Sequence, residues 1–262
     1  MRLLNKFFNA IAQRKPILLE SNYITPTQEF SNKTALVFGG GTGIGKAIAE
    51  ELKKNGADVI ICGRTEIDSV EYKFRKIDVS DFMNLYGNLD SLICDHIDIV
   101  INSQGICPEN DFKGNFAQID YDDFDKVFDV NTKSVYFITK FFAEYFSKNN
   151  IHGRILNICS TEGLKGSCVP YGMSKAATIS LTKGLGKAYA PKGIIINGIA
   201  PGATATKMMK MSSDGDLRRN YIPSKRACTS TEIAKAAHFM LSDAGKQMCG
   251  QVLIIDGGES LH

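Results

Sequence analysis

Apolar and polar positions follow two alternating patterns along the chain after residue 33. Short, mostly apolar runs, typical of strands buried on both faces, recur between longer segments with the i, i+3, i+4 spacing of amphipathic helices. The runs predict strands at 34–38, 58–62, 72–77, 97–102, 154–159, 193–199 and 251–255. The intervening segments predict helices at about 46–55, 81–94, 121–149, 171–190 and 231–242.

This alternation determines the expected fold class. Strands that alternate with helices pair in parallel through right-handed crossovers, which places helices on both faces of the sheet. We therefore predict an α/β, doubly wound Rossmann fold with a parallel seven-stranded sheet. The sequence shows no internal repeat, so we expect a single domain over 32–262, preceded by an extension over 1–31.

The extension has its own pattern. Apolar residues recur at helical spacing with basic residues between or after them, and Pro16 and Pro26 then indicate a linker. We expect an amphipathic helix that packs on its own domain or on a neighbouring subunit; attachment to a membrane surface is the alternative. A signal peptide is not indicated, because a long apolar core and a small-residue cleavage site are both missing.

Composition excludes several classes of function. A net charge of +3, without a cluster of Lys and Arg, gives no reason to expect a nucleic-acid partner. No apolar run approaches the ~18 residues needed to span a bilayer, so we expect no membrane partner. The 7 cysteines show no C-x-x-C pair and no Cys/His metal spacing, which predicts reduced thiols in a cytoplasmic protein without a metal site.

A glycine-rich segment joins the first strand to the first helix of the repeating pattern. Gly39, Gly41, Gly43 and Gly45, with Thr42 and Ile44 between them, follow the strand directly and open the helix. Glycines there allow a tight turn and let a pyrophosphate approach the helix N-terminus. An isolated glycine turn is weak evidence, but in this context it predicts a dinucleotide site.

Tyr171 and Lys175 are the second candidate for chemistry. Residues four apart on a helix share one face. An ammonium near a phenol lowers a pKa that is normally near ~10, which would make Tyr171 a proton donor and acceptor near neutral pH. Alone, such a pair is an ordinary feature of solvated helices.

Together, these segments resemble the short-chain dehydrogenase/reductase family in its single-domain branch. The glycine spacing is G-x-x-x-G-x-G, and the resemblance covers nearly everything after residue 31. Further motifs occur in the family's order, namely Asn102-Ser103-Gln104-Gly105, Asn131, Ser160, Tyr171-x-x-x-Lys175, Pro201-Gly202 with Thr206, and Asp256-Gly257-Gly258.

The resemblance implies an oxidoreductase that transfers a hydride between NADP(H) and a small-molecule carbonyl or alcohol substrate. Tyr171 would be the general acid/base, while Lys175 would lower its pKa and bind the nicotinamide ribose. Ser160 would hold the substrate oxygen, and Asn131 would belong to the proton relay. The implied cofactor-binding residues are Gly39, Gly41, Thr42, Gly43, Ile44, Gly45, Arg64, Asp78, Val79, Asn102, Gly105, Tyr171, Lys175, Pro201, Gly202, Thr204 and Thr206.

Each polar position also has a structural interpretation. Asn131 could hydrogen-bond a helix backbone, Ser160 could end a strand, and Asn102 could bridge two strands. The family further implies a homotetramer, or a homodimer, formed through the two long helices at about 121–149 and 171–190.

The end of the second strand bears on the choice of cofactor. A carboxylate there would repel a 2′-phosphate, whereas this chain has Gly63-Arg64, and a guanidinium binds phosphate well. We expect NADP rather than NAD. In the alternative interpretation, Arg64 stacks on the adenine or faces water.

The chain departs from the family pattern in three places. Phe38 replaces the usual threonine before the glycine turn, and the segment 64–78 is too short for a full helix. The loop between Ser160 and Tyr171 is also short, so Thr161 could share the serine's role. Residues 203–221 correspond to the family's substrate lid, with Met208, Met209 and Met211 as a candidate apolar lining or as part of a packed helix.

The competing function is a non-catalytic, NADP-binding regulatory protein, which predicts loss of Tyr171, Lys175 or Ser160; none is lost. Within the catalytic hypothesis, a 3-oxoacyl-carrier-protein-type reductase is the specific alternative. Divergent enoyl reductases space the tyrosine and lysine more widely, which argues against that class. The fold does not choose among ketone substrates.

Overall fold

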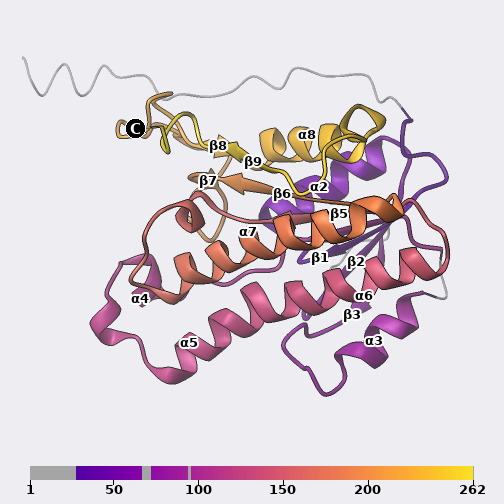
Figure 1. Ribbon diagram of the computed structural model, residues 1–262. Helices are drawn as coiled ribbons and strands as arrows, with labels where there is room; N and C mark the ends of the chain where they lie inside the picture. Colours follow the sequence, from indigo (N-terminus) through magenta and orange to yellow (C-terminus); the bar gives the residue numbers. More distant parts are fainter. Residues whose placement is uncertain (1–27, 67–71, 94–95, 262) are drawn as a thin grey trace, which may run out of the picture.

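The computed structural model describes residues 28–66, 72–93 and 96–261, so the helix expected near the N-terminus lies outside the described residues. Figure 1 shows the elements, which follow in the order β1 (Thr34–Phe38), α2 (Gly43–Lys54), β2 (Asp58–Gly63), β3 (Lys73–Lys76), α3 (Leu85–Leu92), β4 (Ile99–Asn102), α4 (Glu109–Phe112), α5 (Tyr121–Phe128), α6 (Ser134–Lys148), β5 (Arg154–Ile158), α7 (Pro170–Tyr189), β6 (Ile195–Pro201), β7 (Thr204–Ala205), β8 (Cys228–Thr229), α8 (Ser230–Leu241) and β9 (Val252–Ile255).

The main sheet has seven parallel strands in the order β3-β2-β1-β4-β5-β6-β9, which confirms the predicted fold class. The chain moves outward from β1 to β3 and then returns to place β4 on the other side of β1. In register, Phe38 at the end of β1 is aligned with Cys62 and Asn102 on the two neighbouring strands. The carboxyl ends of these strands therefore lie level at the point where the strand order reverses, the usual ligand site of such sheets.

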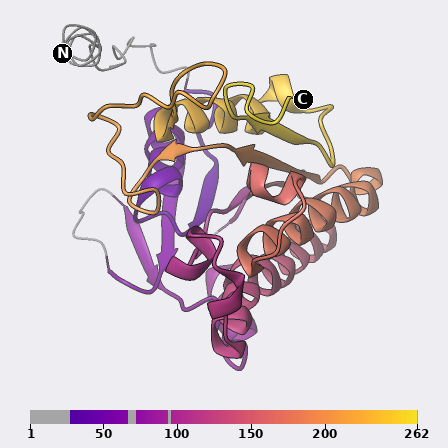
Figure 2. The same cartoon turned by 90° about the vertical axis from the view of Figure 1, so that its left-hand side faces the viewer.

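Helices cover both faces of the sheet, as Figure 2 shows. The helices α2 and α8 pack on one face, and α3, α6 and α7 pack on the other. Alternate residues of β1 serve the two cores, with Ala35 and Val37 in the first and Leu36 and Phe38 in the second. Phe38 is fully buried, and its ring centroid lies 6.4 Å from that of Phe142. The aromatic residue that replaces the family's threonine is therefore a core residue.

The long helix expected over 121–149 is interrupted. The structure has a π-helical turn at Asp129–Lys133 between α5 and α6, and Asn131 lies within it. Such turns are rare and occur often at functional sites. Between β2 and β3, the described residues 64–66 and 72 contain no helix, as the short segment indicated.

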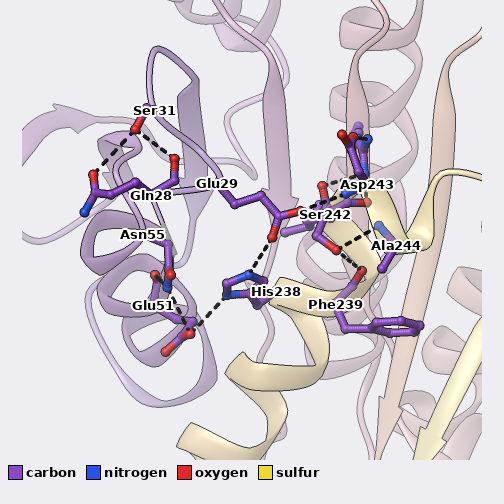
Figure 3. A network of polar contacts seen from close by, with 12 residues as sticks. Gln28, Glu29, Ser31, Glu51, Asn55, His238, Phe239, Ser242, Asp243 and Ala244 are labelled. Carbon is purple, nitrogen blue, oxygen red and sulfur yellow. Dashed lines mark hydrogen bonds and ion pairs between the residues drawn. The ribbon is translucent and has the colours of Figure 1, made fainter. Parts of the chain in front are cut away.

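Residues 28–31 pack against the domain, as Figure 3 shows for their polar contacts. Phe30 is 3% exposed and belongs to the core beneath α2 and α8. The imidazole of His238 on α8 lies between two carboxylates, 3.1 Å from Glu51 of α2 and 3.1 Å from Glu29. This arrangement, which we call the His238 clasp, joins the segment before β1 to both helices of that face.

Within the described part of the chain, no helix is both long enough and apolar enough to cross a membrane.

Candidate active site

A cavity of about 880 Å³ opens at the carboxyl ends of the strands. That volume lies within the range of about 300–1,000 Å³ usual for small-molecule and cofactor sites. It brings together most of the residues proposed from the sequence, namely Gly39, Gly41, Thr42, Gly43, Ile44, Arg64, Asp78, Val79, Gly105, Ser160, Tyr171, Lys175, Pro201, Gly202, Thr204 and Thr206. Gly45, Asn102 and Asn131 are not among the residues that line it.

The glycine turn leaves room for a ligand at the N-terminus of α2. Gly39 has φ +74°, and a Cβ there would lie 2.7 Å from the backbone nitrogen of Gln104. A Cβ at Gly45 would collide with the carbonyl oxygen of Gly39, so Gly45 lets the helix approach the turn instead of lining the cavity. Thr42 makes no capping hydrogen bond through its side chain, and the first turn of α2 holds no acidic residue. The helix therefore presents amides and its positive dipole end without a competing anion, which fits a pyrophosphate.

Two charged residues lie at the end of the cavity beside β2 and β3. Arg64 directly follows β2 and is exposed, while Asp78 is half-buried. Burial alone would raise the pKa of Asp78, but hydrogen bonds from Ser80 and the charge of Arg64 hold this pKa below its ordinary value. Asp78 is thus an anionic hydrogen-bond acceptor beside an exposed guanidinium.

Tyr171 and Lys175 lie on the first and second turns of α7. Lys175 is 4% exposed, and its Nζ donates a hydrogen bond to the carbonyl oxygen of Ile158 over 2.9 Å. The same nitrogen lies 5.9 Å from the centroid of the Tyr171 ring. The four-residue spacing therefore places both groups at one side of the cavity, as the helical pattern predicted.

Burial opposes the effect that Lys175 was expected to have on the pKa of Tyr171. Burial is the dominant effect and raises the pKa of Tyr171 to about 12, although a hydrogen bond from Ser160 acts in the opposite direction. Negative charge from the nearby thiols and Glu162 would raise it further. Burial also lowers the pKa of Lys175 itself. Because the ammonium is desolvated and its hydrogen bond goes to a backbone carbonyl, it does not offset the desolvation of the phenol.

Ser160 is the hydroxyl that acts on the Tyr171 phenol, where it works to lower the phenol's pKa. Its Oγ accepts a hydrogen bond from the backbone N–H of Glu162 over 3.2 Å. Thr161 also lines the cavity and is 2% exposed, but it is Ser160 whose hydroxyl acts on the phenol. The arrangement pairs two hydroxyl groups at the wall of one cavity, which suits them to hold a single oxygen atom of a ligand.

Asn131 supports the site from behind. Its Oδ1 accepts from the N–H of Ile106 over 2.8 Å, and its Nδ2 donates to the carbonyl oxygen of Ile106 over 2.9 Å and to Ser174 Oγ over 3.2 Å. These bonds tie the π-helical turn to the loop after β4 and to α7. A Cβ at Gly105 would lie 3.5 Å from Asn131 Oδ1 and 3.6 Å from Lys175 Nζ, so the glycine keeps the space between the two polar groups open.

Asn102 has a structural role in this site, and its expected contact with a cofactor stays a prediction. It is 1% exposed, and its Nδ2 donates to Asn157 Oδ1 over 2.8 Å and to Thr139 Oγ1 over 3.1 Å. The side chain thus bridges β4, β5 and α6. The interpretation of Asn102 as a bridge between strands is the one that the structure supports, because these bonds hold its amide away from the cavity.

Several residues that line the cavity near Tyr171 carry no recognisable sequence signal. Cys107, Asp111, Phe112, Glu162, Val169 and Glu259 line this part of the cavity. They come from two loops, the end of the chain and a short helix, where no periodic pattern marks a functional position. Of the three methionines in the proposed lid, Met208 and Met209 line the cavity and Met211 does not. Residues 207–210 form turns, not a packed helix.

Within residues 28–66, 72–93 and 96–261, no group of His, Cys, Asp and Glu side chains has the arrangement of a metal site.

Comparison with known proteins identifies the family. A family model described as enoyl-(acyl carrier protein) reductase matches residues 39–260. A 3β-hydroxysteroid dehydrogenase of Eggerthella lenta is 32% identical over 254 residues, which cover 88% of this chain and 96% of the relative. A 3-oxoacyl-acyl-carrier-protein reductase of Chlamydia trachomatis is 32% identical over 246 residues, covering 87% and 97%.

A solved structure gives the same result. A putative 2-deoxy-D-gluconate 3-dehydrogenase of Agrobacterium tumefaciens, with NADP bound, is 31% identical and superposes with a TM-score of 0.79, covering 90% of this chain and 99% of that one. The glycine turn, the Tyr-x-x-x-Lys pair and the doubly wound sheet agree with these matches, and the chain belongs to the short-chain dehydrogenase/reductase family.

Proposed function

We propose that the protein is an NADP-dependent oxidoreductase that interconverts a carbonyl and an alcohol, with Tyr171 as the proton donor and acceptor. The observation that carries the proposal is that Ser160, Tyr171 and Lys175 line the same cavity as the glycine turn, with the Ser160 hydroxyl acting on the phenol. One cavity thus offers a site for a hydride carrier and a pair of hydroxyl groups for a carbonyl oxygen.

Different residues of the cavity would bind different parts of the cofactor. The amides of the glycine turn and the N-terminus of α2 would bind the pyrophosphate. Lys175 would hydrogen-bond the nicotinamide ribose, and Pro201, Gly202, Thr204 and Thr206 would hold the nicotinamide end. NADP(H), when bound, would supply or accept the hydride, while the protein orients the substrate and moves the proton.

The raised pKa of Tyr171 sets the protonation state in which the phenol would meet a ligand. A phenol with a pKa of about 12 keeps its proton throughout the neutral range, so it is ready to donate to a carbonyl oxygen. The Ser160 hydroxyl would share the developing negative charge. In the direction of carbonyl reduction, Tyr171 would therefore act as the acid.

Arg64 supports NADP over NAD. Arg64 is exposed at the cavity and directly follows Gly63. In sites that select NAD, a carboxylate at this position repels the 2′-phosphate, and this chain has a guanidinium there instead. A relative of similar length binds NADP in its solved structure. Asp78 and Val79 would contact the adenine, and Arg64 would bind the 2′-phosphate through charge-assisted hydrogen bonds.

We further propose a cytoplasmic homotetramer that is assembled through α6 and α7. Tyr136 on α6 is 41% exposed and Tyr121 at the start of α5 is 91% exposed, so this side of the molecule carries large side chains available for contact. Sedimentation equilibrium of the full chain tests this, with a monomer as the contrary result.

Oxidation of NADPH in the presence of a set of carbonyl compounds tests the function. The set contains a 3-ketosteroid, a 3-oxoacyl thioester and a keto-sugar, because relatives act on compounds of these kinds by name. An enoyl thioester tests the reaction named in the family model, which the three-residue gap between Tyr171 and Lys175 disfavours. We expect turnover of at least one ketone and none of the enoyl compound.

Two results would contradict the proposal. Turnover that persists unchanged in Tyr171→Phe would exclude the assigned mechanism. Tight NADPH binding without turnover of any ketone would favour the non-catalytic, regulatory alternative.

A further inference from the structure

Asp111 makes a direct contact with the backbone of the proposed catalytic tyrosine. It lies on the short helix α4, within the loop that follows β4, and is 5% exposed. Its Oδ2 accepts a hydrogen bond from the backbone N–H of Tyr171 over 2.6 Å. The loop after β4 is thereby joined to the first turn of α7.

The first turn of α7 lacks a local partner for this amide. Backbone N–H groups in the first turn of a helix have no acceptor within the helix. Val169, at the N-cap position, makes no side-chain capping bond, and Pro170 has no N–H to donate. The N–H of Tyr171 is therefore the first donor of the helix, and Asp111 supplies its acceptor from 60 positions earlier in the chain.

The burial of Asp111 makes it an energetically unfavourable helix cap. Its second oxygen, Oδ1, is buried and has no hydrogen-bond partner among the described residues. Burial raises the pKa of Asp111, only partly offset by the Tyr171 N–H. A buried carboxylate with an unpaired oxygen is destabilising.

A second helix cap in the same chain uses an exposed aspartate, which stays hydrated. Asp120 is exposed at the start of α5, and its Oδ1 accepts from the N–H of Asp123 over 2.7 Å. Helix stabilisation alone thus does not require a buried aspartate. What distinguishes Asp111 is the residue that it holds.

We propose that Asp111 is a positioning residue for the reaction, which fixes the backbone of Tyr171 against the loop after β4 and so sets the phenol in reach of Ser160. This inference rests on the proposed function, because it assigns no chemistry to Asp111. A displacement of a reacting group by about 1 Å can cost on the order of 100-fold in rate. The contact therefore acts on kcat through the placement of Tyr171.

Three variants test the proposal, with turnover, NADPH affinity and thermal unfolding measured for each. Asp111→Ala removes the acceptor, and we expect kcat to fall about 10- to 100-fold while the Kd for NADPH changes by less than about threefold. Asp111→Asn keeps an oxygen for the Tyr171 N–H, and we expect kcat within about threefold of the wild type. Asp120→Ala removes a cap of the same kind away from the cavity and should leave kcat unchanged.

The pH profile and amide exchange separate positioning from other roles. Asp111 is not among the groups that shift the pKa of the Tyr171 phenol, so Asp111→Asn should leave the pH dependence of kcat in place. Hydrogen exchange should show a protected Tyr171 amide in the wild type and at least about 10-fold faster exchange in Asp111→Ala.

Each outcome has a defined meaning. A fall in kcat of about 10-fold or more in Asp111→Asn, or an unprotected Tyr171 amide in the wild type, would overturn the inference; both readouts remain if the alanine variant does not fold. Full activity of Asp111→Ala would also overturn it. If Tyr171→Phe is as active as the wild type, the proposed function fails instead, which the panel of ketones shows independently.

Discussion

Lys175 Nζ donates a hydrogen bond to the carbonyl oxygen of Ile158 over 2.9 Å, two positions before Ser160. This bond joins α7, which carries Tyr171, to Ile158 at the end of β5, and Ser160 follows that strand by two residues. The buried ammonium therefore holds the two hydroxyl groups of the site at one place, in addition to any contact with a cofactor.

Replacement of Lys175 by methionine should separate function from stability. We expect turnover to fall at least about 100-fold, because the link between α7 and β5 and the proposed ribose contact are both lost. The unfolding free energy at pH 7 should stay within about 2 kcal/mol of the wild type, since methionine removes a costly buried charge and offsets the unpaired carbonyl. Chemical denaturation and turnover measure the two effects.

Lys183→Met is the matched control for this prediction. Lys183 lies on the same helix but is exposed to solvent, so its replacement should change neither quantity. Turnover of Lys175→Met at the wild-type rate would show that Lys175 is not required for the reaction.

The ionisation of Tyr171 provides a second prediction. The absorbance difference between the wild type and Tyr171→Phe, recorded after a rapid pH jump before unfolding, should show phenolate formation with a midpoint near 12. A raised pKa means that the folded state favours the neutral phenol. Its contribution to stability is complete below pH ~10 and is lost as the pH rises from there toward 12. A midpoint below 10 would restore the original expectation that Lys175 lowers the pKa.

Arg64 provides a prediction about cofactor choice. Arg64→Ala should raise the KM for NADPH about 10- to 100-fold and change the KM for NADH by less than about threefold, because the guanidinium would bind only the 2′-phosphate. Arg75→Ala is the control, since Arg75 lies on the neighbouring strand β3 and does not line the cavity. An equal change in the KM for NADPH and the KM for NADH would show that Arg64 does not bind the 2′-phosphate.

Much of the fold follows from local patterns. Six of the seven strands coincide with apolar runs, because burial on both faces leaves a continuous hydrophobic signal, whereas the edge strand β3 is mostly polar and exposed. Most helices begin and end within a few residues of their predicted bounds. The glycine turn and the Tyr171–Lys175 pair were also recognisable, since turn geometry and helical spacing are local properties.

Features that depend on tertiary contacts were not recognisable. The π-helical turn at Asn131 changes the backbone without changing the apolar pattern around it. The bond from Asp111 to Tyr171 spans 60 positions and follows only from packing. The direction of the Tyr171 pKa shift depends on how burial compares with nearby charge, which spacing along a helix does not reveal.

The His238 clasp provides a prediction about stability. His238→Ala removes hydrogen bonds to Glu29 and Glu51 and the edge-on contact with the Phe30 ring, at a centroid distance of 5.0 Å. We expect the unfolding free energy to fall by about 1–3 kcal/mol, because a hydrogen bond from the ring to a carboxylate contributes about 1.5–3 kcal/mol. Urea denaturation at neutral pH measures this loss.

His96→Ala serves as the control for the clasp. The His96 ring is 64% exposed and lies 3.4 Å from Asp98, a carboxylate that Lys33 also contacts. Its loss should cost less than about 0.5 kcal/mol. Equal losses in the two variants would show that the clasp does not stabilise the domain.

The most direct measurement of the central claim compares Tyr171→Phe with the wild type, using NADPH and the best ketone from the panel. The account predicts that NADPH binds the variant with a Kd within about threefold of the wild type, while kcat falls by about 100-fold or more because the proton donor is lost. An unchanged kcat with intact NADPH binding would contradict the assignment of Tyr171 as the proton donor.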